Sequence, residues 1–277
     1  MRINFHISIL LVFTLNTSIC FSQTKVEESK TELKKGSSEE NVHSNQHSGG
    51  GGGSRSLEAE TIGGTILNYF MYGIGVVIIG DPENEPALHS PLTKYPYYKW
   101  CNGNYENDTL KFAHNRGRID MENKFLFSNT DLIGNHLKVK ARPFQYLYFQ
   151  GDYFQITAYN NRSKSYDNLP LFNLNFCYDR VRTEYFNMGW TIGVNYAGSD
   201  VKRAGFAYGL NAEGFIFKNV SLSGAARWSS INREPVNASE LSFRYHLKRY
   251  FFTVGYEHLK IASPAYDFAG IGAGVYF

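Results

Sequence analysis

The feature that most constrains this chain is an alternation of apolar and polar side chains over much of its length. Alternation with a period of two residues predicts β-strands, because successive side chains of a strand point to opposite faces. We predict strands at 65–80, 124–142, 146–159, 169–181, 185–198, 204–217, 220–231, 238–248, 250–261 and 267–277. The fold class is therefore all-β, a single antiparallel barrel of ten strands, or of eight if the first two do not belong to it.

The predicted strands each have one apolar and one polar face. The apolar faces carry Phe176, Tyr178, Trp190, Ile192, Val194, Tyr196, Phe206, Tyr208, Leu210, Leu222, Trp228, Leu241, Phe243, Tyr245, Leu247, Phe252, Val254 and Tyr256. The polar faces carry Asn173, Asn175, Cys177, Asp179, Asn211, Glu213, Ser221, Ser223, Arg227, Ser242, Arg244, His246, Thr253 and Glu257. A membrane barrel turns its apolar face toward lipid, whereas a soluble barrel buries it. Alternation alone does not separate these two cases.

The last eight residues repeat the alternation and stop on an aromatic side chain. Ile271, Ala273, Val275 and Phe277 form one face, and the other face is mostly glycine. This ending resembles the C-terminal signature of Gram-negative outer-membrane β-barrels. The resemblance implies that the last strand closes a transmembrane barrel in outer-membrane lipid and that Phe277 is an assembly signal for the barrel assembly machinery.

The N-terminal sequence predicts export. Residues 1–22 have an early cation, an apolar core and a polar run, which is the pattern of a secretory signal peptide. Cys20 offers lipidation as an alternative, which is disfavoured because Ile19 stands where a lipid-attachment motif needs a small residue. Residues 23–60 are charged and then glycine-rich, so they are expected to be a disordered periplasmic arm, either a tether or a spacer. The barrel domain is predicted at 61–277.

Composition agrees with a barrel. Aromatic residues make up 16% of the chain and charged residues 19%, below the roughly 25% charged of soluble proteins. The mean hydropathy of -0.35 argues against a helical membrane protein. The uncharged stretch 61–80 is long enough for a transmembrane helix, but its glycines and β-branched run favour a strand. The net charge of +3 is too small to indicate nucleic acid as a partner.

The links between strands predict the sidedness of the barrel. Outer-membrane barrels have tight periplasmic turns and longer outer loops. Tight turns are expected at Pro143, 218–219 and Arg249, and longer loops at 160–165, 198–200 and 232–235. The turn-rich residues 81–123 are expected to form the longest outer loop, whose aromatic cluster either binds sugar rings or is the small core of the loop.

The polar faces supply the candidate site. We expect a lattice of ion pairs across the lumen from Asp179, Glu213, Arg227, Arg244, His246 and Glu257. Hairpin register places Arg244 close to Glu257, and Arg227 close to Arg244. Because side chains fill small barrels, the lattice is interpreted as a plug, with a selectivity filter as the alternative.

Two cysteines remain once the signal peptide is removed. Cys101 lies in the long loop and Cys177 on a polar face. In an oxidising compartment a disulfide between them would pin the loop inside the lumen. Two free thiols are the alternative.

Motifs for catalysis and cofactors are lacking. Metal, phosphate and dinucleotide signatures are missing, so no cofactor is predicted. His258, Ser263 and Asp267 offer catalytic residue types, but their spacing matches no motif and no enzyme activity is predicted. The predicted function is structural or accessory, a plugged barrel that is a subunit of a larger outer-membrane complex. A narrow porin for small solutes is the alternative.

Overall fold

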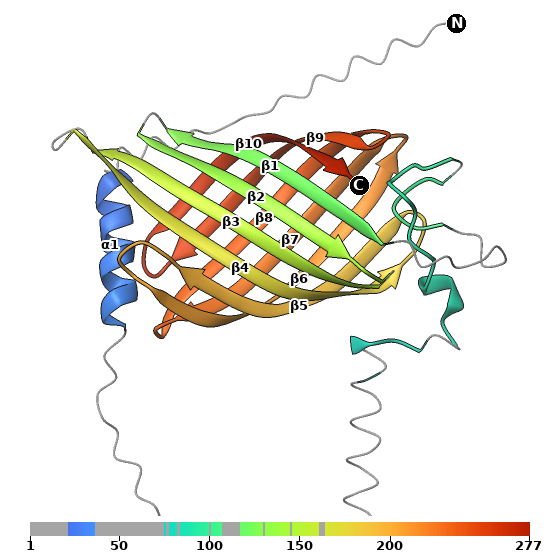
Figure 1. Ribbon diagram of the computed structural model, residues 1–277, viewed down its shortest axis with the longest axis horizontal. Helices are drawn as coiled ribbons and strands as arrows, with labels where there is room; N and C mark the ends of the chain where they lie inside the picture. Colours follow the sequence, from blue (N-terminus) through green and yellow to red (C-terminus); the bar gives the residue numbers. More distant parts are fainter. Residues whose placement is uncertain are drawn as a thin grey trace, which may run out of the picture.

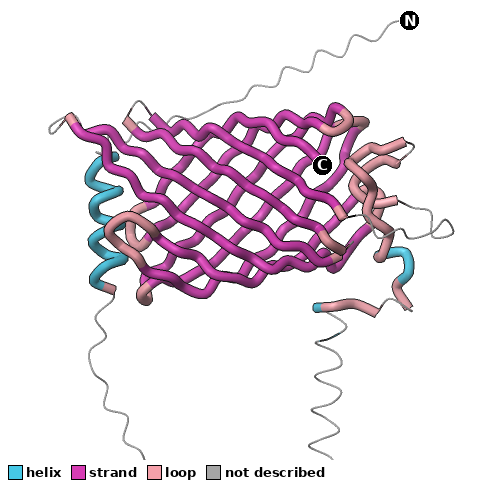
Figure 2. Tube along the Cα trace, in the orientation of Figure 1, coloured by secondary structure: helices cyan, strands magenta, loops and turns pink. Residues whose placement is uncertain are grey.

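Ten antiparallel strands close into one barrel, which confirms the predicted fold class (Figure 1). The computed structural model describes residues 22–36, 75, 78–81, 84–99, 101–106, 117–129, 131–144, 146–160 and 164–277. The strands are β1 Arg118–Asn129, β2 Leu132–Arg142, β3 Leu147–Asn160, β4 Ser165–Arg182, β5 Phe186–Ala197, β6 Arg203–Phe217, β7 Val220–Ile231, β8 Glu234–Leu247, β9 Tyr250–Ile261 and β10 Ala265–Tyr276. A helix α1 Ser22–Lys35 and a short 3-10 helix η1 Pro86–Leu88 complete the described elements. Figure 2 shows the near and far walls crossing at an angle, the strand tilt that barrel closure requires.

The ten strands are not the ten predicted. The predicted strand 124–142 is two strands, β1 and β2, separated by a tight turn at turn-forming residues that the apolar pattern obscured. The predicted strand 65–80 has no place in the barrel, because β1 pairs with β10 on one side and with β2 on the other. Gly75 and Ile78 within it are helical. Residues 65–74, 76 and 77 lie outside the described part of the chain, as does the predicted signal peptide up to residue 21.

The barrel has two ends, which we name by what lies there. The C-terminal end holds Phe277, the start of β1 and the links that follow β2, β4, β6 and β8. The α1 end holds the links that follow β1, β3, β5, β7 and β9. The turns predicted to be tight therefore share the C-terminal end, and the loops predicted to be longer share the α1 end. The link between β7 and β8 is nevertheless short, because Asn232 and Arg233 both adopt positive φ, as a two-residue hairpin turn requires.

Helix α1 covers the α1 end of the barrel. The prediction of a disordered arm at 23–60 is therefore wrong for the residues that form this helix. Val26, Ser29, Lys30 and Leu33 are buried, and their spacing places them on one helical face. Val26 and Leu33 join an apolar cluster that fills this end of the barrel interior. The sequence indicated this helix only through the spacing of these four residues within a segment that is otherwise charged. The remainder of the predicted arm, from residue 37 to residue 60, lies outside the described residues.

The long loop was predicted to share an end with the other longer loops, which lie at the α1 end. It lies instead at the C-terminal end (Figure 1). Of the predicted loop 81–123, the described residues 81, 84–99, 101–106 and 117 precede β1, and residues 118–123 belong to β1 itself. The error follows from the misplaced first strand. Leu92 and Tyr105 are buried against the barrel. Helix α1 and this loop therefore lie at opposite ends of the barrel.

The two faces of the wall have opposite character. Large apolar side chains cover the exterior, and Leu174, Phe206 and Ile271 are each about two-thirds exposed. Charged and polar side chains fill the interior, including Lys124, which is 0% exposed. An apolar exterior around a polar interior is the arrangement of a membrane-spanning barrel.

Among the described residues, no helix has the length and apolar character to cross a membrane.

Candidate functional site

A cluster of four charged side chains occupies the middle of the lumen. Glu240 of β8 and Glu257 of β9 are paired directly opposite each other, an arrangement that destabilises like charges. Lys124 of β1 lies between them, with its Nζ 3.1 Å from Glu240 Oε2 and in contact with the Glu257 carboxylate. Lys138 of β2 donates a further hydrogen bond to Glu240. The two ammonium groups offset the repulsion between the carboxylates.

The glycine residues on one face of β10 leave space for the side chains of this cluster. A Cβ at Gly272 would lie 2.7 Å from the Lys124 side chain, and one at Gly274 would lie 2.1 Å from the Phe251 ring. Both distances are too short for carbon atoms, so these positions leave space for the lumen side chains of β1 and β9. The glycines of the terminal segment are therefore part of the packing of the lumen.

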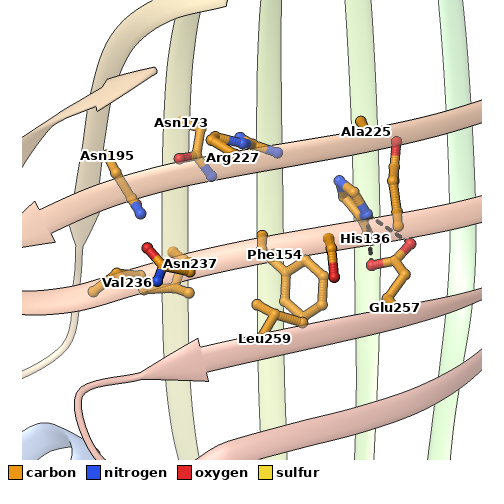
Figure 3. A pocket seen from close by; sticks show the side chains of 14 residues that line it. His136, Phe154, Asn173, Asn195, Ala225, Arg227, Val236, Asn237, Glu257 and Leu259 are labelled. Atoms are coloured by element: carbon orange, nitrogen blue, oxygen red, sulfur yellow. Dashed lines mark hydrogen bonds and ion pairs between the residues drawn. The ribbon is translucent and has the colours of Figure 1, made fainter. Parts of the chain in front are cut away.

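His136 of β2 links the central cluster to the next layer. Its Nδ1 lies 3.0 Å from Glu257 Oε1 and its Nε2 lies 3.1 Å from Asp152 Oδ1. Ionised carboxylates only accept hydrogen bonds, so the imidazole donates from both nitrogens. Arg227 Nη1 donates to the other oxygen of Asp152 at 2.9 Å. Figure 3 shows His136 bonded to Glu257 at the wall of a small cavity that Phe154 and Leu259 also line.

Arg244 of β8 forms a second cluster nearer the C-terminal end. Its two terminal nitrogens donate to Glu122 at 2.8 Å and to Glu213 at 3.0 Å. Ser221 also donates to Glu213, at 2.9 Å, and lies 2.8 Å from a ring nitrogen of His246. Each carboxylate of this layer therefore faces a guanidinium or a hydroxyl, as buried charges require.

The long loop enters the C-terminal end of the lumen through Tyr105. The Tyr105 hydroxyl donates to Asp179 Oδ2 at 2.5 Å, and Arg142 Nη1 donates to the same oxygen at 2.7 Å. Burial and the neighbouring Asp179 carboxylate raise the pKa of Tyr105 well above its usual range. Asn104 beside it accepts a hydrogen bond from Arg118 Nη1 at 2.8 Å. This end of the lumen is thus closed by a buried residue held by β2 and β4.

One ion pair and one hydrogen bond hold the start of the loop to the end of β4. Arg180 donates to Glu85 at 2.7 Å, and Arg182 lies 2.8 Å from His89 Nδ1. The backbone hydrogen bond with Asp81 and the bond with Arg180 lower the pKa of Glu85. Burial and the two arginines lower the pKa of His89.

Polar contacts hold α1 in place at the α1 end of the barrel. The Ser29 hydroxyl lies 3.1 Å from the Ile261 carbonyl oxygen and 2.8 Å from the Tyr266 hydroxyl. Glu32 accepts a hydrogen bond from the Ser263 backbone N–H at 2.8 Å. Asn232 donates to the Leu33 carbonyl oxygen at 3.0 Å. Both ends of the barrel are therefore covered by parts of the same chain.

The residues predicted for the lattice lie in the lumen, but with other partners than expected. Arg244 bonds to Glu122 and Glu213 and not to Glu257, because its register partner on β9 is Thr253. The charges of β1 to β3 were missed, namely Glu122, Lys124, His136, Lys138, Arg142 and Asp152, together with Glu240 of β8. Their period-two spacing was the available signal, and the undetected turn between β1 and β2 concealed it.

The predicted disulfide is not formed. Cys101 and Cys177 are both free thiols. Cys177 is buried in the wall of the lumen, with its Sγ 3.9 Å from the Asn175 carbonyl oxygen. Tyr105 holds the loop in the lumen instead, through its hydrogen bond to Asp179, which is ion-paired with Arg142. Burial near Glu106 and Glu184 raises the pKa of Cys101 to about 11.

The predicted catalytic types do not assemble. His258 Nδ1 lies 2.7 Å from Asp267 Oδ1, and both side chains are substantially exposed. Ser263 contributes a backbone hydrogen bond to Glu32 of α1, and no bond joins its hydroxyl to His258 in the described part of the chain.

A group of metal-ligating types occurs at the centre of the lumen. Ligand atoms of His136, Glu240 and Glu257 lie within 4.8 Å of one another. Lys124 and Lys138 contact the same carboxylates, so ammonium groups already supply the positive charge there. The geometry is that of an internal ion-pair cluster.

Comparison with known proteins gives likeness of fold only. No protein-family model and no curated protein matches the sequence. Among solved structures, the outer membrane protein Ail of Yersinia pestis is 11% identical, with 58% of this chain and all of that chain covered and a TM-score of 0.33. An outer membrane channel from Pseudomonas putida F1 is 8% identical, with 62% of this chain and all of that chain covered and a TM-score of 0.37. A loop-deletion mutant of OmpT of Vibrio cholerae is 12% identical, with 68% and 73% covered and a TM-score of 0.32.

The architecture of the chain itself defines its class. The barrel is closed, antiparallel and even in strand number, and it has an apolar exterior and a charged interior. Closed barrels satisfy every backbone hydrogen bond within the wall, which is what the interior of a membrane demands. The chain is a transmembrane β-barrel of the outer-membrane type.

Proposed function

We propose that this protein is a closed outer-membrane barrel with a structural or accessory role, and that it acts as a subunit of a larger outer-membrane complex. The observation that carries the proposal is the filling of the lumen. Helix α1 covers one end, Tyr105 enters the other, and ion pairs between facing walls occupy the middle. A solute path through the barrel would have to break all three.

The energetics support a permanent closure. Removing one partner of a buried ion pair leaves an uncompensated charge, which typically costs about 3–5 kcal/mol. Lys124, Arg142 and Arg244 each hold such pairs across different strands. Opening a path along the axis would separate several pairs at once, so thermal motion at the ends is not expected to open one.

The narrow porin is the second candidate, because small cavities line the charged interior. Three cavities along the described lumen are lined by side chains of the lattice, and each has a volume of only 20 to 40 Å³. That is space for a few water molecules. The cavities favour internal hydration over conduction.

The accessory role is tested by the size of the native particle. The protein should be extracted from its own membrane in mild detergent, and its sedimentation compared with that of the same barrel refolded alone. The proposal expects a faster-sedimenting particle that contains stoichiometric partner chains. A native particle that sediments as the isolated barrel would overturn the accessory role and leave the closed fold standing.

A further inference from the structure

One cavity of the lumen is bordered by more positive than negative charge. It lies between the central cluster and the C-terminal end. Its cations are Lys140, Arg142, Arg227 and Arg244, and its carboxylates are Glu213 and Glu240. The neighbouring cavity shares Lys140, Arg142 and Arg244 and adds Arg118 and Lys138. Lys140 therefore lies at the border of two cavities that are both rich in cations.

Lys140 differs from the other cations of this region. Arg142, Arg227, Arg244 and Lys138 each lie within 4.0 Å of a carboxylate oxygen. Lys140 has no such partner among the residues that the structure describes. Its ammonium lies 5.6 Å from the centre of the Tyr148 ring, a contact that offsets only part of the cost of removing an ammonium from water. The ammonium of Lys140 thus has no carboxylate in direct contact, and Glu213 on the border of the same cavity attracts it only from beyond ion-pair distance.

Unused hydrogen-bond donors occur on other side chains of the same cavity. The Nε of Arg244 and the Nδ2 of Asn211 are buried and have no acceptor in the described part of the chain, whereas the Nε of Arg142 already lies 3.4 Å from Asp120 Oδ2. Buried donors almost always have partners in folded proteins. Water would satisfy these N–H groups but would not neutralise Lys140.

We propose that this cavity holds a small oxyanion, of the size of inorganic phosphate or sulfate, bound by Lys140. The anion supplies a counter-charge for Lys140 and acceptor oxygens for the Arg244 Nε–H and the Asn211 amide, while the unpaired Oδ1 atoms of Asn175 and Asn187 on the same cavity wall require a donor such as water. Its contacts with Lys140 and Arg244 are charge-assisted hydrogen bonds, which are stronger than bonds between neutral groups. The cavity, with a volume of about 40 Å³, has room for an ion of a few atoms. This site goes beyond the closed-barrel function, and only the slow release of the ion rests on the closed ends.

The closed ends determine how the anion is detected. An ion bound behind α1 and Tyr105 enters when the barrel folds and leaves slowly. The full chain should be refolded in a phosphorus-free detergent with inorganic phosphate present, then dialysed exhaustively, and the phosphorus content per barrel measured by elemental analysis. Refolding in chloride of equal ionic strength gives the baseline. The expected result is close to one phosphorus atom per barrel, and a value at the baseline overturns the proposal.

Variants locate the ion. Lys140→Met removes the unpaired charge and should fold at least as well as the parent, while retained phosphorus falls by about tenfold or more, as expected for the loss of a charge-assisted bond. Asn211→Ala is a second variant that leaves every ion pair intact and should lower retention less. Lys202→Met, at an exposed lysine of the α1 end, is the matched control and should retain the parent value.

Glu213→Gln separates binding at this site from unspecific attraction. It removes a negative charge from the cavity border and should raise retention when phosphate is limiting. Equal retention in the parent and in Lys140→Met, or a loss in Lys202→Met of the same size, overturns the assignment. Heat-modifiable migration on a gel verifies that each variant is folded before the phosphorus is measured.

Discussion

Lys124→Met is the most informative perturbation of the lumen. The substitution keeps a long apolar side chain but removes the ammonium that lies between Glu240 and Glu257. Ligand oxygens of these carboxylates are within 4.8 Å of each other. At an effective dielectric constant of about 20, two unit charges at that separation repel by about 3.5 kcal/mol. This value agrees with the roughly 3–5 kcal/mol for breaking a buried pair, so we expect a loss of about 3 kcal/mol in the free energy of unfolding.

The assay is reversible urea unfolding of the barrel in lipid vesicles, followed by tryptophan fluorescence. Lys202→Met makes the same chemical change at an exposed position and should shift the midpoint little. The double variant Lys124→Met with Glu257→Gln removes one of the two repelling charges and should recover at least half of the loss. A loss below about 1 kcal/mol in Lys124→Met, the range of exposed pairs, would refute the reasoning, as would a double variant less stable than the single one.

Three further predictions concern the two ends. Leu33→Asp places a charge in the apolar cluster that Leu33 joins, so protease should cleave α1 readily while the barrel keeps its heat-modifiable migration; an α1 that stays resistant would contradict its docked position. His89 and Glu85 both have lowered pKa values in the folded protein, so the stability that they give to loop docking is present above their unfolded values of 6.5 and 4.5 and is lost as the pH falls. Hydrogen-exchange protection of residues 84–106, corrected for intrinsic rates, should therefore fall between pH 7 and pH 5, and His89→Gln should flatten that profile; protection that rises with acid would contradict the sign. In a variant without the native thiols, cysteines at exposed Glu28 and Lys99 should react with a membrane-impermeant reagent from opposite sides of the membrane. Labelling from the same side would contradict the placement of α1 and the loop at opposite ends of the barrel.

The alternation of side chains was sufficient to predict the wall of the barrel from β3 onward. It failed at the turn between Asn129 and Leu132, because the side-chain pattern continues through this turn and conceals the boundary between β1 and β2. The lumen charges of β1 and β2 were therefore not predicted. The strand count came out right because a false strand at 65–80 replaced the missing one. That substitution also reversed the end at which the long loop was expected.

The sequence could not predict which charged residues pair with each other in the lumen. Arg244 meets Glu122 across the closure of the barrel, and such contacts depend on the tilt and register of strands far apart in the chain. Helix α1 was missed for a different reason. Only Val26 and Leu33 mark its apolar face, and they gain their stability from the barrel and not from the helix itself.

The central claim, a barrel closed along its axis, is tested most directly by planar-bilayer recording. The full chain should be reconstituted from detergent, with heat-modifiable migration and flotation with lipid as evidence that folded barrels have inserted. A barrel whose lumen is filled by α1, Tyr105 and the lattice of ion pairs should show no stable conductance steps at any salt concentration. Reproducible unitary steps from the inserted, unmodified protein would contradict the claim and assign the porin function instead.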